Sequence, residues 1–152
     1  MKNIATNKKA RRDYEIMESI EAGIELKGSE VKSLRTHSGN IDDAFVRIER
    51  DEAWLYNFHI PEYAQSSFYR VDPKRVRKLL LHKKEIMRFS GLLSRKGLTI
   101  VALNAHFNDK GIVKITIALA KGKKQYDRRK DLKDEITRRE VDRAMKDAIK
   151  RR

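Results

Sequence analysis

Basic side chains gather at both ends of the chain, and the chemistry they offer is the neutralisation of a polyanion. Lys8, Lys9, Arg11 and Arg12 lie together near the N-terminus, and residues 121–152 hold fourteen Lys or Arg against seven Asp or Glu. Because the whole chain has a net charge of +14, about half of the excess comes from its last fifth. Clustered positive charge attracts anionic partners, and nucleic acid and an acidic membrane surface both fit it.

One pair of carboxylates could support catalysis. Asp42 and Asp43 are adjacent, and a nuclease could use two such groups to hold magnesium. Neighbouring residues on a strand point to opposite faces, however, which places these two poorly for sharing one ion. A solvated turn before the strand that starts at Ala44 is the stronger interpretation, so we expect no enzyme activity.

Other catalytic and metal-binding signatures are absent from the sequence. The chain has no cysteine, no Gly-rich phosphate loop and no Gly-x-Ser-x-Gly elbow,. More than twenty residues separate each histidine from the next in the series His37, His59, His82 and His106. We therefore expect no metal and no cofactor. With no export signal and no long apolar run, we expect a cytoplasmic protein that does not enter a membrane.

The first half of the chain shows a mixture of strand and helix patterns. Residues 1–12 are polar and basic, which predicts an extended arm that becomes ordered on a partner. Residues 14–20 and 24–26 read as strands around a glycine-marked bulge or bend at 21–23. Ser29 then suits the N-cap of a short helix over 30–36, whose outward face would carry Lys32 and Arg35.

The middle of the chain predicts a strand pair and then a helical segment. Strands are expected over 44–48 and 53–58, with most of the aromatic rings of Trp54, Tyr56 and Phe58 in the core. Asp72 followed by Pro73 is typical of a helix start, so we predict a basic helix through residue 81. Helical spacing then continues through Ile86, Phe89 and Leu92 or Leu93 as far as Gly97.

The last folded segment predicts a β-hairpin, and a different pattern follows it. Apolar residues alternate over 98–107 and 113–119 around a turn at 108–111,. In the tail, one narrow apolar edge recurs at helical steps, and a helix over 131–149 would be about 28 Å long. Such a helix has no broad face to bury, so we predict a tail that is disordered when free and helical when bound.

These elements predict a mainly β fold with short helices. A small closed antiparallel barrel of the OB type leaves no exposed edge strand, so it is the economical arrangement. We expect three parts: a basic N-terminal arm (1–12), an OB-like RNA-binding barrel (13–122) and a basic C-terminal tail (123–152). A monomer is the expected state.

Four segments, in this order, carry a resemblance to a known family. They are EAGI at 21–24, GSEVKSLR at 28–35, RKLLLH at 77–82 and AKGKKQYDRR at 120–129, with NKKA at 7–10 ahead of them. Together they resemble the SmpB family of tmRNA-binding proteins in bacterial trans-translation. The resemblance implies an OB-like barrel that grips the tRNA-like domain of tmRNA. It also implies a tail that enters the empty mRNA channel and decoding centre of a stalled ribosome, with an elongation factor and GTP acting through tmRNA.

The resemblance also assigns RNA contacts within the barrel. Glu21 would accept hydrogen bonds from an exocyclic amine or a 2'-hydroxyl, and Leu80 would pack on an exposed base. His82 would stack or donate a hydrogen bond, at a position where the family often has asparagine. The remaining contacts would neutralise or position phosphates: Asn7, Lys8, Lys9, Arg12, Lys32 and Arg35.

The same resemblance divides the tail into steps. Gly122, Lys123 and Lys124 match the hinge into the ribosome, and Tyr126 stands where histidine is frequent and could stack on ribosomal RNA. Accommodation in the decoding centre is linked to Asp127, Arg128 and Arg129. Contacts with the channel wall are linked to Met145 and Lys146.

A ribosomal or general structured-RNA-binding protein remains an alternative. It would share the barrel, the arm and the tail but would bind ribosomal RNA permanently. Selectivity for the tRNA-like domain of tmRNA over unrelated hairpins separates the two.

Overall fold

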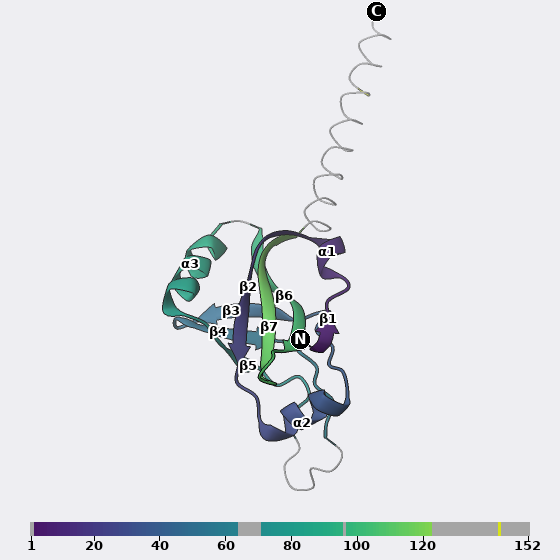
Figure 1. Ribbon diagram of the computed structural model, residues 1–152. Helices are drawn as coiled ribbons and strands as arrows, with labels where there is room; N and C mark the ends of the chain where they lie inside the picture. Colours follow the sequence, from purple (N-terminus) through teal and green to yellow (C-terminus); the bar gives the residue numbers. More distant parts are fainter. Residues whose placement is uncertain (1, 64–70, 96, 123–142, 144–152) are drawn as a thin grey trace, which may run out of the picture.

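The computed structural model describes residues 2–63, 71–95, 97–122 and 143. This part of the chain forms seven strands and three short helices (Figure 1). In chain order they are β1 (Lys2–Thr6), α1 (Ala10–Asp13), β2 (Tyr14–Ile24), α2 (Gly28–Thr36), β3 (Phe45–Glu49), β4 (Glu52–Tyr56), β5 (Arg77–Leu80), α3 (Lys83–Leu93), β6 (Leu98–Phe107) and β7 (Val113–Gly122).

The strands form one antiparallel sheet that closes on itself. Its order is β1-β6-β3-β4-β5-β2-β7, and a further pairing of β7 with β6 completes a ring of hydrogen-bonded strands. The predicted closed antiparallel barrel with short helices is thereby confirmed. Register shifts interrupt β2 between Ile16 and Glu18 and β6 between Ala102 and Asn104. Bulges of this kind bend strands, which closure of a small barrel requires.

The predicted hairpin, β6 with β7, and the neighbouring pair, β2 with β7, are the two most extensive strand pairings. Strand β7 pairs along its length with β6 on one side and β2 on the other. In the turn, the Asn108 side chain accepts hydrogen bonds from the amides of Lys110 and Ile112. Gly111 has a φ of 75°, a left-handed conformation that favours glycine. The alternating apolar pattern and the residues of the turn therefore both favour the same hairpin.

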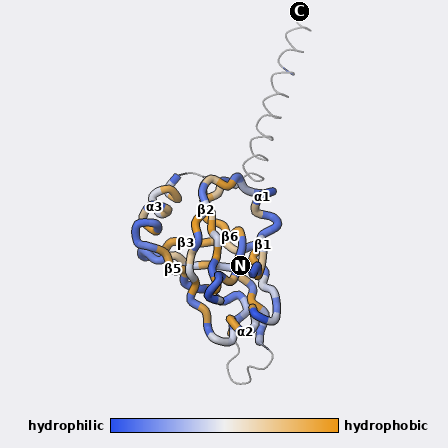
Figure 2. The backbone as a smooth tube through the Cα atoms, viewed as in Figure 1, coloured by the Kyte–Doolittle hydropathy of each residue, from blue (hydrophilic) through white to orange (hydrophobic). Residues whose placement is uncertain are grey.

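The core fills the inside of the ring. Phe58 and Ile117 are fully buried there, and Phe89 of α3 is buried in the same cluster. Figure 2 shows the hydrophobic colour concentrated on the strands. A second, smaller cluster lies on the outside, where Ala10 of α1 covers Leu103, Ala118 and neighbouring residues. Burial of a large apolar side chain contributes about 1.5–3 kcal/mol, so the two clusters fix both faces of the β6–β7 hairpin.

The helix predicted from Asp72 is wrong, because most of this segment is a turn and a strand. The Asp72 carboxylate and carbonyl accept hydrogen bonds from the Lys74 and Arg75 amides, which makes a tight turn. The Pro73 carbonyl accepts from the amide of Ile60 and is unavailable to a helix. Residues 77–80 then form β5 between β4 and β2. The helix predicted through Ile86 and Phe89 does exist, as α3.

The N-terminal arm also differs from the prediction. Residues 2–6 form β1, which pairs with β6, and Ile4 and Ala5 are buried. Apolar residues within a polar segment thus hold the first residues on the barrel. The expected bulge or bend at residues 21–23 is wrong as well, since β2 extends through Ile24 and its register shift lies between Ile16 and Glu18.

Two smaller predictions need correction. Helix α2 begins at Gly28 with Lys27 in the N-cap position, and the Glu30 side chain accepts the Lys27 amide at 2.8 Å. In β4 the buried residues are Ala53 and Leu55, so Trp54 and Tyr56 lie half-buried on the outside; of the three aromatic rings only that of Phe58 is in the core. The alternation of the side chains was predicted, but which of the two alternating sets faces the core was not. No helix of the described residues is long and apolar enough to cross a membrane.

Candidate RNA interface

A groove of about 590 Å³ brings together three residues that are distant in the sequence. Glu21 comes from β2, Leu80 from the end of β5, and His82 from the residue before α3. All three side chains are exposed, and Leu80 keeps 49% of its surface in contact with solvent. An exposed leucine beside a carboxylate and an imidazole can pack on a base while the polar groups bind its edge.

Gly23 explains how Leu80 can lie across the sheet. The two residues are direct partners in the β2–β5 ladder. A Cβ atom at Gly23 would lie 3.1 Å from the Cβ of Leu80, which is tighter than ordinary packing. The glycine therefore opens the space that keeps Leu80 over β2, on the floor of the groove.

The charges of the groove nearly balance. Carboxylates of Glu21, Asp51, Glu52 and Glu85 face lysines 78, 83 and 114, and the Lys78 amine lies 3.3 Å from the Glu52 carboxylate. Such a surface is a poor general phosphate binder. It suits groups that donate hydrogen bonds, such as exocyclic amines and 2'-hydroxyls.

A buried histidine beside the groove was not singled out by sequence reasoning as a site residue. His106 on β6 is 5% exposed, and its Nδ1 lies 2.9 Å from Oδ1 of Asn104. Its Nε2 lies 3.4 Å from Oε2 of Glu21 and has no hydrogen-bond partner among the described residues. Only the tertiary pairing of β6, β7 and β2 brings these groups together, so no local sequence signal points to them.

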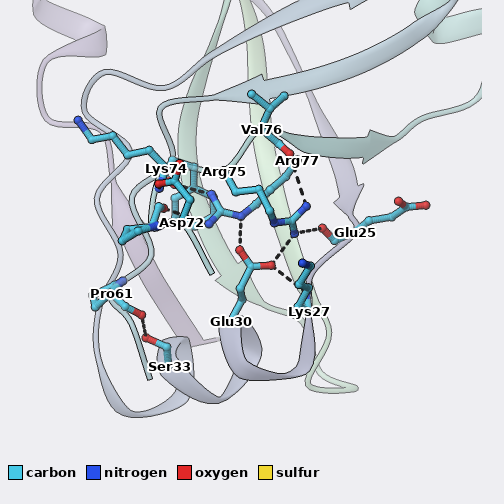
Figure 3. Close-up of polar contacts among 12 residues, drawn as sticks. Glu25, Lys27, Glu30, Ser33, Pro61, Asp72, Lys74, Arg75, Val76 and Arg77 are labelled. Carbon is cyan, nitrogen blue, oxygen red and sulfur yellow. Dashed lines mark hydrogen bonds and ion pairs between the residues drawn. The ribbon is translucent and has the colours of Figure 1, made fainter. Parts of the chain in front are cut away.

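A buried ion-pair cluster holds β5 against α2 (Figure 3). The Glu30 carboxylate accepts hydrogen bonds from Nη2 of Arg75 and, at 2.6 Å, from Nε of Arg77. Arg77 is fully buried and also donates to the carbonyls of Phe58 and Pro73. This cluster fixes the strand that ends at Leu80.

The charge states in this cluster depend on one another. Burial alone would raise the pKa of Glu30, but hydrogen bonds from Arg75 and the Lys27 amide, together with the charge of Arg77, bring the pKa below its ordinary value,. Burial lowers the pKa of Arg77, and the charge of Glu30 opposes that effect. Each charge is thus tolerated inside the protein because the other is present.

Helix α2 presents a basic face, as predicted. Ser33 and Leu34 are buried, and Ser33 donates to the carbonyl of Pro61. Lys32 and Arg35, three positions apart, are both exposed. The helix follows the groove end of β2, so these cations can act as phosphate-positioning groups near that end.

The other basic cluster lies at the opposite end of β2; we call it the α1 end, residues 7–13 with Asp42 and Asp43. Asn7 is buried there, donating to the Ala102 carbonyl and accepting the amides of Lys9 and Ala10. Its side chain is therefore occupied in holding α1, while Lys8, Lys9 and Arg12 are exposed. The structure does not bring these cations together with Glu21, which lies seven residues farther along β2 from Tyr14.

Asp42 and Asp43 are used within the α1 end. The Asp42 carboxylate accepts the amide of Lys8 at 3.2 Å, and the Asp43 carboxylate lies 3.7 Å from the amine of Lys9. In the part of the chain that the structure covers, no group of three or more His, Cys, Asp or Glu side chains could hold a metal ion. The two aspartates thus position the basic segment.

A half-buried aromatic face on β3 and β4 was also missed. The rings of Phe45 and Tyr56 stack with centroids 5.2 Å apart, and the Arg47 guanidinium lies over both. Trp54 is the direct partner of Arg47 in the ladder. Alternation alone could have found this face, had its inward phase been assigned to the smaller residues.

Most of the tail residues lie outside the described part of the chain. Gly122 is described, as the last residue of β7 and the ladder partner of Tyr14. The chain therefore leaves the barrel beside α1. The other tail assignments stay predictions: Lys123, Lys124, Tyr126, Asp127, Arg128, Arg129, Met145 and Lys146.

The closed β ring, the groove of mixed polarity and the basic surfaces define a small β-barrel protein suited to binding a folded nucleic acid. Comparison with known proteins specifies the family. The family model described as "SmpB protein" matches residues 4–147. The chain belongs to the SmpB family.

Individual relatives are similar to this chain along nearly its whole length. The SsrA-binding protein of Thermosipho melanesiensis is 51% identical over 99% of both chains. That of a Sulfurihydrogenibium species is 52% identical over 98% of this chain and 97% of its own. A solved structure described as "tmRNA-SmpB: a journey to the center of the bacterial ribosome" contains a chain with 49% identity and a TM-score of 0.66, matching 78% of this chain and 82% of that one.

Proposed function

We propose that this protein binds the tRNA-like domain of tmRNA and delivers it to stalled ribosomes for trans-translation. Relatives about half identical over nearly their full length are SsrA-binding proteins, and a similar chain occurs in a tmRNA-SmpB structure on the bacterial ribosome. The role is one of binding and delivery and requires no bond to be made or broken by the chain.

The groove is the observation within the molecule that carries this proposal. Three residues that the family resemblance assigns to RNA contact come from separate segments and line one cavity. Their chemistry is complementary to an unstacked base and its neighbouring sugar. In this proposal the ring acts as an OB-type barrel that uses one face and its loops for RNA.

The basic residues have a second task in the proposal. The tail leaves the barrel at Gly122, beside the cations of α1. It would be disordered in the free protein and would become helical in the empty mRNA channel, where it stands in for a codon near the decoding centre. The elongation factor and GTP would act through tmRNA rather than on this chain.

Deleting everything after Gln125 tests this division. The truncated protein should bind the tRNA-like domain with nearly the affinity of the full chain, because the groove is intact. It should fail to support peptide tagging on stalled ribosomes in a reconstituted translation system. Equal loss of binding and tagging would contradict a tail with its own task.

A general structured-RNA-binding protein is the second candidate, favoured by the aromatic face and the exposed cations. Competition between the tRNA-like domain and an unrelated hairpin of equal length, at one salt concentration, separates the two. Similar affinities would favour the general role.

A further inference from the structure

We propose that His106 is a positioning residue for Glu21 and that RNA binding closes their contact into a hydrogen bond. The inference rests on the proposed function, because it concerns the same groove. It begins from a polar atom that is buried without a partner, Nε2 of His106, which points toward a carboxylate 3.4 Å away. Buried polar atoms without partners are rare and costly in folded proteins.

The surroundings of His106 leave Glu21 as the natural partner. On β7 its ladder partner is Lys114, and on β1 it is Asn3. Lys114 offers no acceptor to the ring, and the Asn3 side chain is hydrogen-bonded to Thr6 and makes no hydrogen bond with Nε2. The charged groups that face His106 from the packed strands are thus Glu21 and Lys114, and of these only Glu21 can accept a hydrogen bond.

The far side of the ring is already fixed. Nδ1 lies 2.9 Å from Oδ1 of Asn104, so the imidazole cannot turn freely. A ring with protons on both nitrogens donates to Asn104 as that side chain stands, and it can donate to Glu21 once the carboxylate moves closer than 3.4 Å,. A neutral ring donates to one of them, and it can donate to Glu21 once the Asn104 amide presents its nitrogen to Nδ1. In both states Nε2 is the donor that Glu21 can use.

Glu21 is free to complete the contact. Its side chain is 52% exposed on the outer face of β2, so a small rotation brings its carboxylate to within 3 Å or so of Nε2. One oxygen would then be held by His106 and the other would face the RNA. A carboxylate fixed in this way pays less conformational entropy when it binds an amine or a 2'-hydroxyl.

A mutant cycle with the tRNA-like domain of a tmRNA as the probe tests the inference. His106→Phe removes the donor and should weaken binding about tenfold, since a hydrogen bond to a charged group is lost. His106→Gln keeps an N–H in a similar place and should stay within about threefold of the unmodified protein. In a Glu21→Ala background, His106→Phe should change the affinity less than about twofold, because the residue acts through Glu21.

Nitrogen NMR of the histidine side chains supplies a second readout. The Nε2 proton of His106 should become protected from exchange when the tRNA-like domain is added, and it should stay unprotected in Glu21→Ala. The inference is overturned if His106→Phe lowers the melting temperature but leaves the affinity unchanged, or if the two substitutions weaken binding independently. If the unmodified protein prefers an unrelated hairpin, the proposed function fails instead.

Discussion

The groove and the α1 end lie at opposite ends of β2 and present opposite kinds of surface. In the groove, Leu80 is half-exposed and carboxylates balance lysines. At the α1 end, basic side chains are in slight excess over aspartates and no exposed apolar side chain lies among these described residues; the side chains of Lys9 and Arg12 are 48% and 62% exposed. One surface can recognise base edges, whereas the other can only position a phosphate backbone.

This difference separates specificity from general affinity. Phosphate contacts release counterions, so the part of the affinity that they supply falls steeply with salt. Packing on a base and hydrogen bonding to its edge release no phosphate counterions, so the affinity that they supply depends much less on salt. The groove should therefore decide which RNA binds, and the α1 end should change the affinity for all RNAs alike.

Breaking the scaffold that carries the groove should have the largest effect. Glu30→Gln leaves the buried charge of Arg77 without its partner and should lower the free energy of unfolding by about 3–5 kcal/mol. Thermal and urea unfolding followed by circular dichroism measure this change. Glu25→Gln, at an exposed position in the preceding loop, is the matched control and should leave the free energy of unfolding nearly unchanged. Equal stability of the two variants would contradict the role of the cluster.

The same carboxylate predicts an acid limit. The pKa of Glu30 is lowered on folding from its ordinary value of 4.5, so the unfolded chain binds the proton more readily. The stabilisation it supplies is complete above about pH 4.5 and is lost as the pH falls through the lower folded pKa. Unfolding measured across this range should show the loss, and the Glu30→Gln variant should show less of it. An unchanged pH dependence in the variant would assign the acid limit to other groups.

Removing the apolar floor of the groove should weaken specific binding. Leu80→Ala should cost about 1–3 kcal/mol of affinity for the tRNA-like domain, because the packing on a base is lost. Binding of an unrelated hairpin should change little. Met87→Ala, which truncates an exposed apolar residue of α3 outside the groove, is the control. A parallel loss for both RNAs would show that Leu80 does not contribute to selectivity.

Removing one cation at the α1 end should have the smallest effect. Lys9→Gln should weaken the binding of both RNAs by a similar factor and reduce the slope of log affinity against log salt by about one. Titrations at several salt concentrations measure the slope. Lys84→Gln on α3 removes an exposed lysine outside both surfaces and should leave the slope unchanged. A selective loss for one RNA would contradict the assignment of the α1 end to phosphates.

Local sequence patterns correctly predicted those helices and strands for which the apolar spacing and the turn or cap residues indicate the same structure. The β6–β7 hairpin has alternating apolar residues and a turn that begins at Asn108 and ends at Gly111, and α3 has helical spacing; both were predicted correctly. The segment at 72–81 failed because Asp72 and Pro73 are typical of a turn as well as of a helix start. The buried Arg77 has a partner, Glu30, 47 residues away, and local sequence cannot show that such a charge will be inside.

In the candidate site too, sequence reasoning found the residues with a recognisable motif and missed those that only the tertiary fold brings together. The family resemblance supplied Glu21, Leu80 and His82, and the groove brings them together. It gave no reason to divide the RNA contacts between two ends of β2, since that division depends on the register of the barrel. His106 was missed because its contact with Glu21 crosses β7. No regular spacing in the sequence indicates that two residues on strands either side of a third will meet.

One ratio tests the central claim most directly: the affinity for the tRNA-like domain divided by the affinity for an unrelated hairpin of equal length. It is measured at low and high salt for the unmodified, Leu80→Ala and Lys9→Gln proteins. The account predicts that Leu80→Ala lowers the ratio at both salt concentrations and that Lys9→Gln leaves the ratio unchanged. A ratio that depends on Lys9 and not on Leu80 would contradict it.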